Sequence, residues 1–170
     1  MTLRLLLSLL LLAAPFRVFG DAPPPADFAA TVSAAKDVPA VAAILQEQLR
    51  RPLALIMEVK DADSLTKAKT ALVEVTTNID AIAKRLLQLP ALSTAERTAL
   101  SKKMAAADRA HLKAAQPALK AHLEAMPAGL KEEALKALGD FYKTVEDHKQ
   151  VFELYLKPDG KPSKPEKTKC

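Results

Sequence analysis

The stretch that decides the fold is residues 64–89, SLTKAKTALVEVTTNIDAIAKRLLQL. It carries two interleaved sets of apolar residues, and each set repeats every seven residues. The two sets are Leu65, Leu72, Ile79 and Leu86, and Ala68, Val75, Ile82 and Leu89. Such heptad spacing puts both sets on one face of an α-helix that packs lengthwise on other helices. We therefore predict one long helix here, capped by Asp63 or Ser64 and ended by Pro90.

Upstream of this helix, residues 38–60 predict another. Asp37 can cap its start, and Pro39 suits the first turn. Its apolar stripe consists of Val38, Ala42, Leu45, Leu49, Ile56 and Val59. Pro52 lies on the same stripe and is expected to kink the helix, because proline frees a backbone carbonyl one turn earlier.

Downstream, two further helices are predicted. Ser93 and Glu96 form a capping-box pattern that opens a helix running to about Met126, with a bend expected at Pro117. This helix is rich in alanine, which permits the close approach of a neighbouring helix. The last predicted helix spans residues 128–156. Its inner face combines Ala134, Leu138, Phe141, Val145, His148, Phe152 and Tyr155.

Short connections between long helices favour antiparallel neighbours. The predicted fold is therefore all-α, an antiparallel up-down bundle of about four long helices with a kinked first helix and disordered termini. A three-helix core with a broken first helix across it is the alternative. The expected organisation is a signal peptide at 1–20, a Pro-rich linker or short helix at 21–36, the helical bundle domain at 37–156 and a disordered basic tail at 157–170.

The N-terminus has the layout of a secretory signal peptide. Arg4 precedes the apolar run of residues 5–14, and a small-residue site follows with cleavage expected between Gly20 and Asp21. The run is too short to span a bilayer, which takes about 20 apolar residues. We expect an exported chain, periplasmic or secreted, that does not span the membrane.

Charge is unevenly distributed. The chain has 25 Lys and Arg against 20 Asp and Glu, but the excess lies in the signal peptide and the tail, and residues 21–156 are neutral. A neutral body argues against nucleic-acid binding. A basic tail can bind an anionic envelope polymer. Its lysines are Lys157, Lys161, Lys164, Lys167 and Lys169. The single cysteine, Cys170, can be free or form an intermolecular disulfide.

Catalytic and cofactor motifs are missing from the sequence: it has no haem-attachment motif, phosphate loop or His-Glu-x-x-His. The candidate metal ligands are His111, His122 and His148, with Asp108 or Asp147 beside them. A metal site would require His148 to meet His111 or His122. Axial haem ligands, in the same carrier hypothesis, would come from the methionines Met57, Met104 and Met126.

Apolar residues outside the predicted core offer another type of site. Val73 and Leu87 lie off the heptad seam and either widen the core stripe or form a self-association face. The last helix also gathers the aromatics Phe141, Tyr142, Phe152 and Tyr155. These supply core bulk or line a partner groove or ligand pocket.

The joint Val59-Lys60-Asp61-Ala62-Asp63-Ser64 resembles the Val-Lys-Asp-x-x-Ser-Ala joint of a loose set of small, exported, uncharacterised bacterial helical proteins. In that set a heptad helix, a proline turn and a Ser-x-x-Glu helix start follow, as Pro90 and residues 93–96 do here. The likeness covers residues 53–103, with Leu65 where the set usually has alanine. It implies a helical fold and an exported bacterial setting.

Together these observations predict a non-enzymatic, exported helical bundle without a cofactor. We expect it to act as an interaction or structural module of the cell envelope, binding a protein partner or itself through its helix faces. The alternative is a carrier of a small ligand, a metal or haem.

Overall fold

The structure is a computed structural model that describes residues 25–159. This part of the chain is helical and contains no strand, so the all-α prediction is confirmed for it. Its helices are α2 (Pro25–Ala34), α3 (Val38–Met57), α4 (Ala62–Leu86), α5 (Thr94–Ala125), α6 (Ala128–Asp147) and α7 (Lys149–Leu156). The predicted signal peptide, its cleavage between Gly20 and Asp21, the lysines from Lys161 onward and Cys170 lie outside the described residues.

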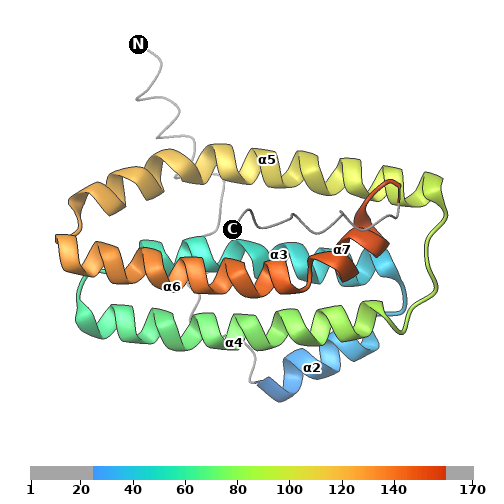
Figure 1. The fold of residues 1–170 in the computed structure, drawn as a ribbon, viewed down its shortest axis with the longest axis horizontal. Helices are drawn as coiled ribbons and strands as arrows, with labels where there is room; N and C mark the ends of the chain where they lie inside the picture. The colour runs from blue at the N-terminus through green and yellow to red at the C-terminus, as the bar shows by residue number, and fades with distance from the viewer. Residues whose placement is uncertain (1–24, 160–170) are drawn as a thin grey trace, which may run out of the picture.

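The four long helices α3, α4, α5 and α6 lie side by side along the longest axis of the molecule (Figure 1). Helix α4 is central to the packing, since it contacts α3, α6, α2 and α7. Helix α5 contacts mainly α3 and α7. No helix in the described range 25–159 combines the length and the apolar character needed to cross a membrane.

The heptad seam of α4 forms the centre of the core. All eight predicted seam residues are buried, and Val75, Ile79, Ile82 and Leu86 have no exposed surface. The start of α4 differs from the prediction, because Asp61 is the cap and Ser64 is the third helical residue. The Asp61 carboxylate accepts from the Ser64 amide at 2.7 Å, and the Ser64 hydroxyl oxygen accepts from the Asp61 amide at 3.0 Å. This reciprocal capping box holds the pKa of Asp61 below its usual range, through the Ser64 hydrogen bonds.

Helix α2 belongs to the same core. Its side chains Phe28 and Val32 are buried in one cluster with residues of α3 and α4. The guanidinium of Arg85 on α4 donates through Nε and Nη2 to the Ala35 carbonyl, at 3.1 and 2.7 Å. A cation at the C-terminal end of a helix satisfies carbonyls that lack intrahelical partners. The core therefore begins before residue 37, the expected start of the bundle domain.

Helix α3 begins where the sequence predicts, with the Asp37 carboxylate accepting from the Ala40 amide at 2.8 Å. It continues through the buried Pro52 and ends at Met57, three residues before the predicted end. A buried polar pair joins it to α4: the Asn78 side-chain amide donates to Gln48 Oε1 at 3.1 Å. The pair satisfies two polar side chains that would otherwise be costly to bury.

The prediction of one continuous helix over residues 128–156 is wrong, because the helix divides at His148 into α6 and α7. The amide of His148 donates to the Val145 carbonyl at 3.2 Å, a tight turn that ends α6. Phe141 before the break and Tyr155 after it are both buried, as expected for aromatic side chains that fill the core. The Tyr155 hydroxyl donates to the Leu89 carbonyl at 3.4 Å.

Helix α5 differs from its neighbours, since none of its 32 residues is buried. Its start is as predicted, a capping box in which the Ser93 amide donates to Glu96 Oε2 at 2.9 Å. Most of its alanines face solvent and do not mediate close helix packing. Two are half-buried, Ala107 and Ala115, and the exposed ones are Ala95, Ala99, Ala105, Ala106, Ala110, Ala114, Ala118, Ala121 and Ala125.

Candidate functional site

The half-buried face of α5 combines polar and apolar side chains. Its leucines that pack against the core are Leu100, Leu119 and Leu123. From α3, the Gln46 side-chain amide donates to the Met104 carbonyl at 3.1 Å and to Asp108 Oδ1 at 2.9 Å. Arg50 forms an ion pair with the same Asp108 oxygen at 3.3 Å. Helix α5 is thus held to α3 by directed polar contacts as well as by apolar burial.

A cavity of about 530 Å³ lies at this α3–α5 contact. Its lining comes almost entirely from α3, with His111 added from α5; the α3 residues are Ala43, Gln46, Glu47, Arg50, Arg51 and Ala54. Two side-chain nitrogens of this lining, Arg50 Nε and His111 Nε2, are buried without a hydrogen-bond partner. Buried polar atoms are nearly always paired in folded proteins, so these two nitrogens are exceptions at the α3–α5 contact.

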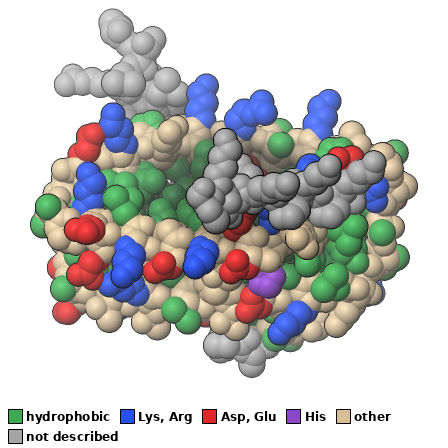
Figure 2. All heavy atoms as spheres, in the orientation of Figure 1, with side chains coloured by type: hydrophobic (Ala, Val, Ile, Leu, Met, Phe, Trp, Pro, Cys, Tyr) green, Lys and Arg blue, Asp and Glu red, His purple; other side chains and the backbone are tan. Residues whose placement is uncertain are grey.

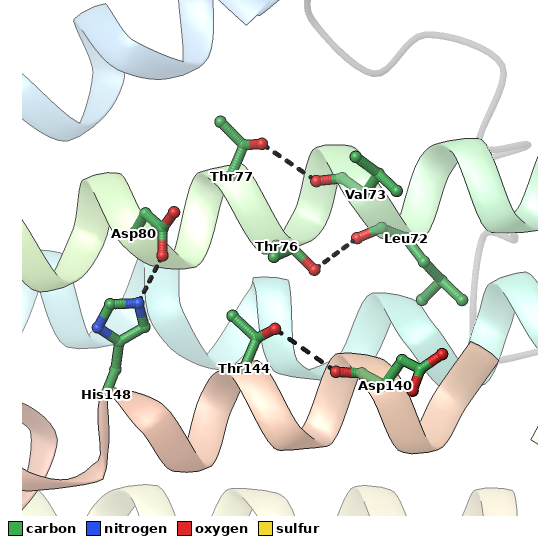
Figure 3. Close-up of polar contacts among 8 residues, drawn as sticks. All are labelled: Leu72, Val73, Thr76, Thr77, Asp80, Asp140, Thr144 and His148. Carbon is green, nitrogen blue, oxygen red and sulfur yellow. Dashed lines mark hydrogen bonds and ion pairs between the residues drawn. The ribbon is translucent and has the colours of Figure 1, made fainter. Parts of the chain in front are cut away.

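The three candidate histidines have three different environments. His111 lines the α3–α5 cavity, and His122 Nε2 lies 3.1 Å from the Ile56 carbonyl oxygen. His148 Nε2 contacts Asp80 Oδ1 on α4 at 2.5 Å (Figure 3). The ring nitrogen of His148 thus meets a carboxylate, and its ring lies beside that of Phe152. Within residues 25–159, no three His, Cys, Asp or Glu side chains are grouped for a metal ion.

A second cavity, of about 450 Å³, is lined by residues of α4 and α6. Lys69 and Glu133 form an ion pair across it at 2.6 Å, and this hydrogen bond lowers the pKa of Glu133. The Thr76 and Thr144 hydroxyls that line it donate to carbonyls of their own helices, as Figure 3 shows. The Lys69–Glu133 pair and the two hydroxyls of this cavity therefore already have partners, while the charged side chains of Lys136 and Asp140 also line it.

An apolar hollow is visible between α5 and α6 on the face shown in Figure 2, near the end where α5 leads into α6. Half-buried apolar residues near these helix ends that pack against the core are Leu119, Leu123, Met126 and Leu130. Two further leucines on the same helices are more open to solvent, Leu112 at 52% and Leu135 at 43% exposure. These helices therefore leave apolar surface uncovered.

The remaining residues that the sequence singled out are the methionines, two apolar residues of the α4 segment and the aromatics of the last helix. Met57, Met104 and Met126 are half-buried. Val73 and Leu87 do not widen the core stripe, since both are exposed. Among the clustered aromatics, Tyr142 is exposed at 43%, stacks edge-on with Phe141, and has a pKa raised by partial burial.

Scans of protein-family models, of curated proteins and of solved structures found no match to this chain. The resemblance of residues 53–103 to exported helical proteins thus stays a prediction. Sequence reasoning named Asp108 and His111 but missed Gln46, Arg50 and Arg51. The sequence did contain a sign of the two arginines' role, because Arg50 and Arg51 are adjacent and interrupt the amphipathic pattern of the α3 segment.

Proposed function

We propose that the protein is a non-enzymatic interaction module of the cell envelope. In this proposal α3, α4, α5 and α6 form an antiparallel bundle, with α3 bent at Pro52. The bundle binds a partner protein that presents an amphipathic helix to the hollow between α5 and α6. Amphipathic helices bind such grooves through apolar residues spaced along one face.

The observation that supports this proposal is the poor burial of α5. It is the longest described helix, yet it buries none of its residues and leaves leucines partly exposed. Exposed apolar patches on single chains commonly mark interaction surfaces. A partner helix covering the α5–α6 hollow would bury side chains such as Leu119 and Leu123, at roughly 25 cal/mol per Å² of apolar surface removed from water.

The test is a pull-down of the mature chain from its own envelope extract, with and without reductant. The decisive variant is Leu119→Gln, and the matched control is Leu87→Gln, which changes an exposed leucine at the end of α4. The proposal predicts that a partner is retained by the wild type and by the control but lost by Leu119→Gln. Capture that is equal in all three proteins, or turnover in an enzyme screen abolished by a point mutation, would refute it.

The compartment and the tail belong to the same proposal. The apolar leader at residues 5–14 supports export, and the five tail lysines support weak binding to anionic envelope polymers. Deletion of residues 157–170 should abolish co-sedimentation with envelope fractions. The control is a double change, Lys102→Gln with Lys103→Gln, which removes charge from the body and should leave co-sedimentation intact. Unchanged co-sedimentation of the deletion would contradict the role of the tail.

A further inference from the structure

We propose that the partner helix bound at the α5–α6 hollow is acidic, with Asp or Glu side chains along the flank that lies on α5. This inference rests on the proposed function, because it specifies the chemistry of the partner at the same site. Two features of the described residues carry it: apolar side chains on the facing sides of α5 and α6, and a basic row on α5 beside them.

The side of α5 that faces α6 is identified by a cavity of about 320 Å³. Ser101 lines this cavity together with Val145 of α6 and Phe152 of α7. Leu112 and Leu119 follow Ser101 by 11 and 18 residues, which are close to three and five full helical turns. Both leucines therefore lie on the same side of α5 as Ser101, the side turned towards α6.

The opposite wall follows in the same way from Val145. Tyr142 and Leu138 precede it by three and seven residues, and so lie on the α5-facing side of α6. Leu135, seven residues before Tyr142, shares that side. Leu112, Leu135 and Tyr142 are all exposed. The hollow in Figure 2 thus has apolar side chains on both walls, which suits the apolar face of a helix.

The outer edge of α5 is basic. Helix α5 has six basic residues against three acidic ones. Arg109, Lys113 and Lys120, at positions i, i+4 and i+11, form one exposed row next to Leu112, and Lys120 pairs with Glu124 at 3.8 Å. Basic side chains line the α5 edge in Figure 2, whereas acidic and basic ones alternate along α6. The charge preference of the hollow therefore comes from α5.

The other acidic residues of α5 do not neutralise this row. Glu96 belongs to the capping box, and Asp108 bonds to α3. Arg109 and Lys113 form no ion pair within residues 25–159. An incoming carboxylate therefore displaces no existing partner. Such exposed pairs add little affinity each, but complementary charge selects one partner over another.

A second copy of this chain and an anionic membrane both fit this charge pattern less well. A second copy that presented α5 would bring its own basic row against this one. An anionic membrane is a broad surface, so it would meet the acidic side chains of α6 as well as the basic row. A helix with one acidic flank contacts the basic row alone.

The test uses three synthetic helical peptides that share one leucine face and carry Glu, Gln or Lys at the flanking positions. Their binding to the mature chain is measured by fluorescence anisotropy. At low ionic strength the Glu peptide should bind about tenfold more tightly than the Lys peptide, with the Gln peptide between them, and added salt should narrow the difference. Leu119→Gln should weaken the binding of all three, because it changes the shared apolar surface.

A double variant, Arg109→Glu with Lys113→Glu, should reverse the order of the Glu and Lys peptides. The matched control is Lys84→Glu with Lys103→Glu, which should keep the wild-type order. It makes the same change in net charge away from the hollow, since Lys84 is on α4 and Lys103 lies nine residues before Leu112, on the opposite side of α5. The tail lysines are the same in all these proteins, and circular dichroism confirms that each variant is folded.

The outcomes separate this inference from the proposed function. If no peptide binds, both are overturned. Equal binding of the three peptides, or an order that the double variant leaves unchanged, overturns the acidic partner but leaves the docking site in place. Sedimentation velocity and co-sedimentation with phosphatidylglycerol vesicles cover the other occupants. A dimer or a vesicle complex that the double variant abolishes would assign the basic row to a second copy or to lipid instead.

Discussion

Helices α4 and α5 begin alike and are held in the molecule differently. Each opens with a capping box, Asp61 with Ser64 for α4 and Ser93 with Glu96 for α5. Yet α4 buries nine of its 25 residues, whereas α5 buries none of its 32. Capping signals determine where a helix starts. The chemistry of the inner face determines how each helix is attached: α4 is held by apolar burial, whereas α5 combines half-buried leucines with polar contacts to α3.

The largest expected effect comes from truncating the α4 seam. Ile79 is fully buried, so Ile79→Ala should lower the free energy of unfolding by about 3 kcal/mol, through lost burial and the cavity left behind. The matched change on α5, Leu119→Ala, removes a half-buried side chain and should cost roughly 1 kcal/mol. Urea unfolding measures both. Equal losses would show that α5 contributes to the core as strongly as α4.

A second prediction concerns local opening. Because α5 has no buried residue, its amides should exchange through a partial unfolding that leaves α3 and α4 folded. Native-state hydrogen exchange should show protection in the middle of α5 about 100-fold lower than around Ile79, which corresponds to roughly 2.7 kcal/mol. Equal protection in the two helices would mean that they unfold as one unit.

The third prediction asks how much a buried hydrogen bond between α3 and α4 contributes to stability. This bond joins Asn78 to Gln48. Asn78→Ala leaves Gln48 Oε1 with only the longer contact from Arg51 Nη1 at 3.4 Å. The expected loss is about 2 kcal/mol, the usual cost of weakening a buried hydrogen-bond partner. On the α5 side, Gln46→Ala should cost less, because water reaches its partner Asp108, whose side chain is 39% exposed. Thermal unfolding of the two variants compares them directly.

A smaller effect is expected at the start of α5. Ser93→Ala removes the side-chain acceptor for the Glu96 amide and should destabilise the helix start by about 1 kcal/mol. Since α5 is loosely attached, the loss should appear as faster exchange of the first-turn amides more than as a lower melting temperature. A clear drop in global stability with unchanged local exchange would contradict this picture.

The pH dependence of the two caps is the last comparison. Hydrogen bonds to Ser93 lower the pKa of Glu96 from its ordinary 4.5, and those to Ser64 lower that of Asp61 from 3.8. A lowered pKa in the folded state means that the stabilisation is present above the ordinary pKa and is lost as pH falls through the folded value. Below about pH 4, acid should therefore fray both helix starts. Glu96→Gln and Asp61→Asn should each flatten that pH dependence at their own helix start, measured by amide exchange.

Sequence patterns predicted the parts of the fold that depend on periodicity. The α4 seam and the starts of α3 and α5 follow from apolar spacing and capping residues, and the structure confirms them. The break at His148 could not be predicted, because it coincides with the contact to Asp80, 68 residues earlier in the chain. The α3–α5 cavity was missed for the same reason, since Arg50 and His111 become neighbours only when two helices pack.

The two hydrogen bonds that Arg85 donates to the Ala35 carbonyl affect the order in which the helices can pack during synthesis. The residues that it joins are 50 positions apart, so α2, the first described helix to leave the ribosome, cannot dock until nearly all of α4 has followed. Closing such a long loop costs entropy before any contact repays it. Phe28 and Val32 therefore stay exposed through the early life of every newly made chain, which gives a chaperone a defined interval in which to bind the N-terminal segment.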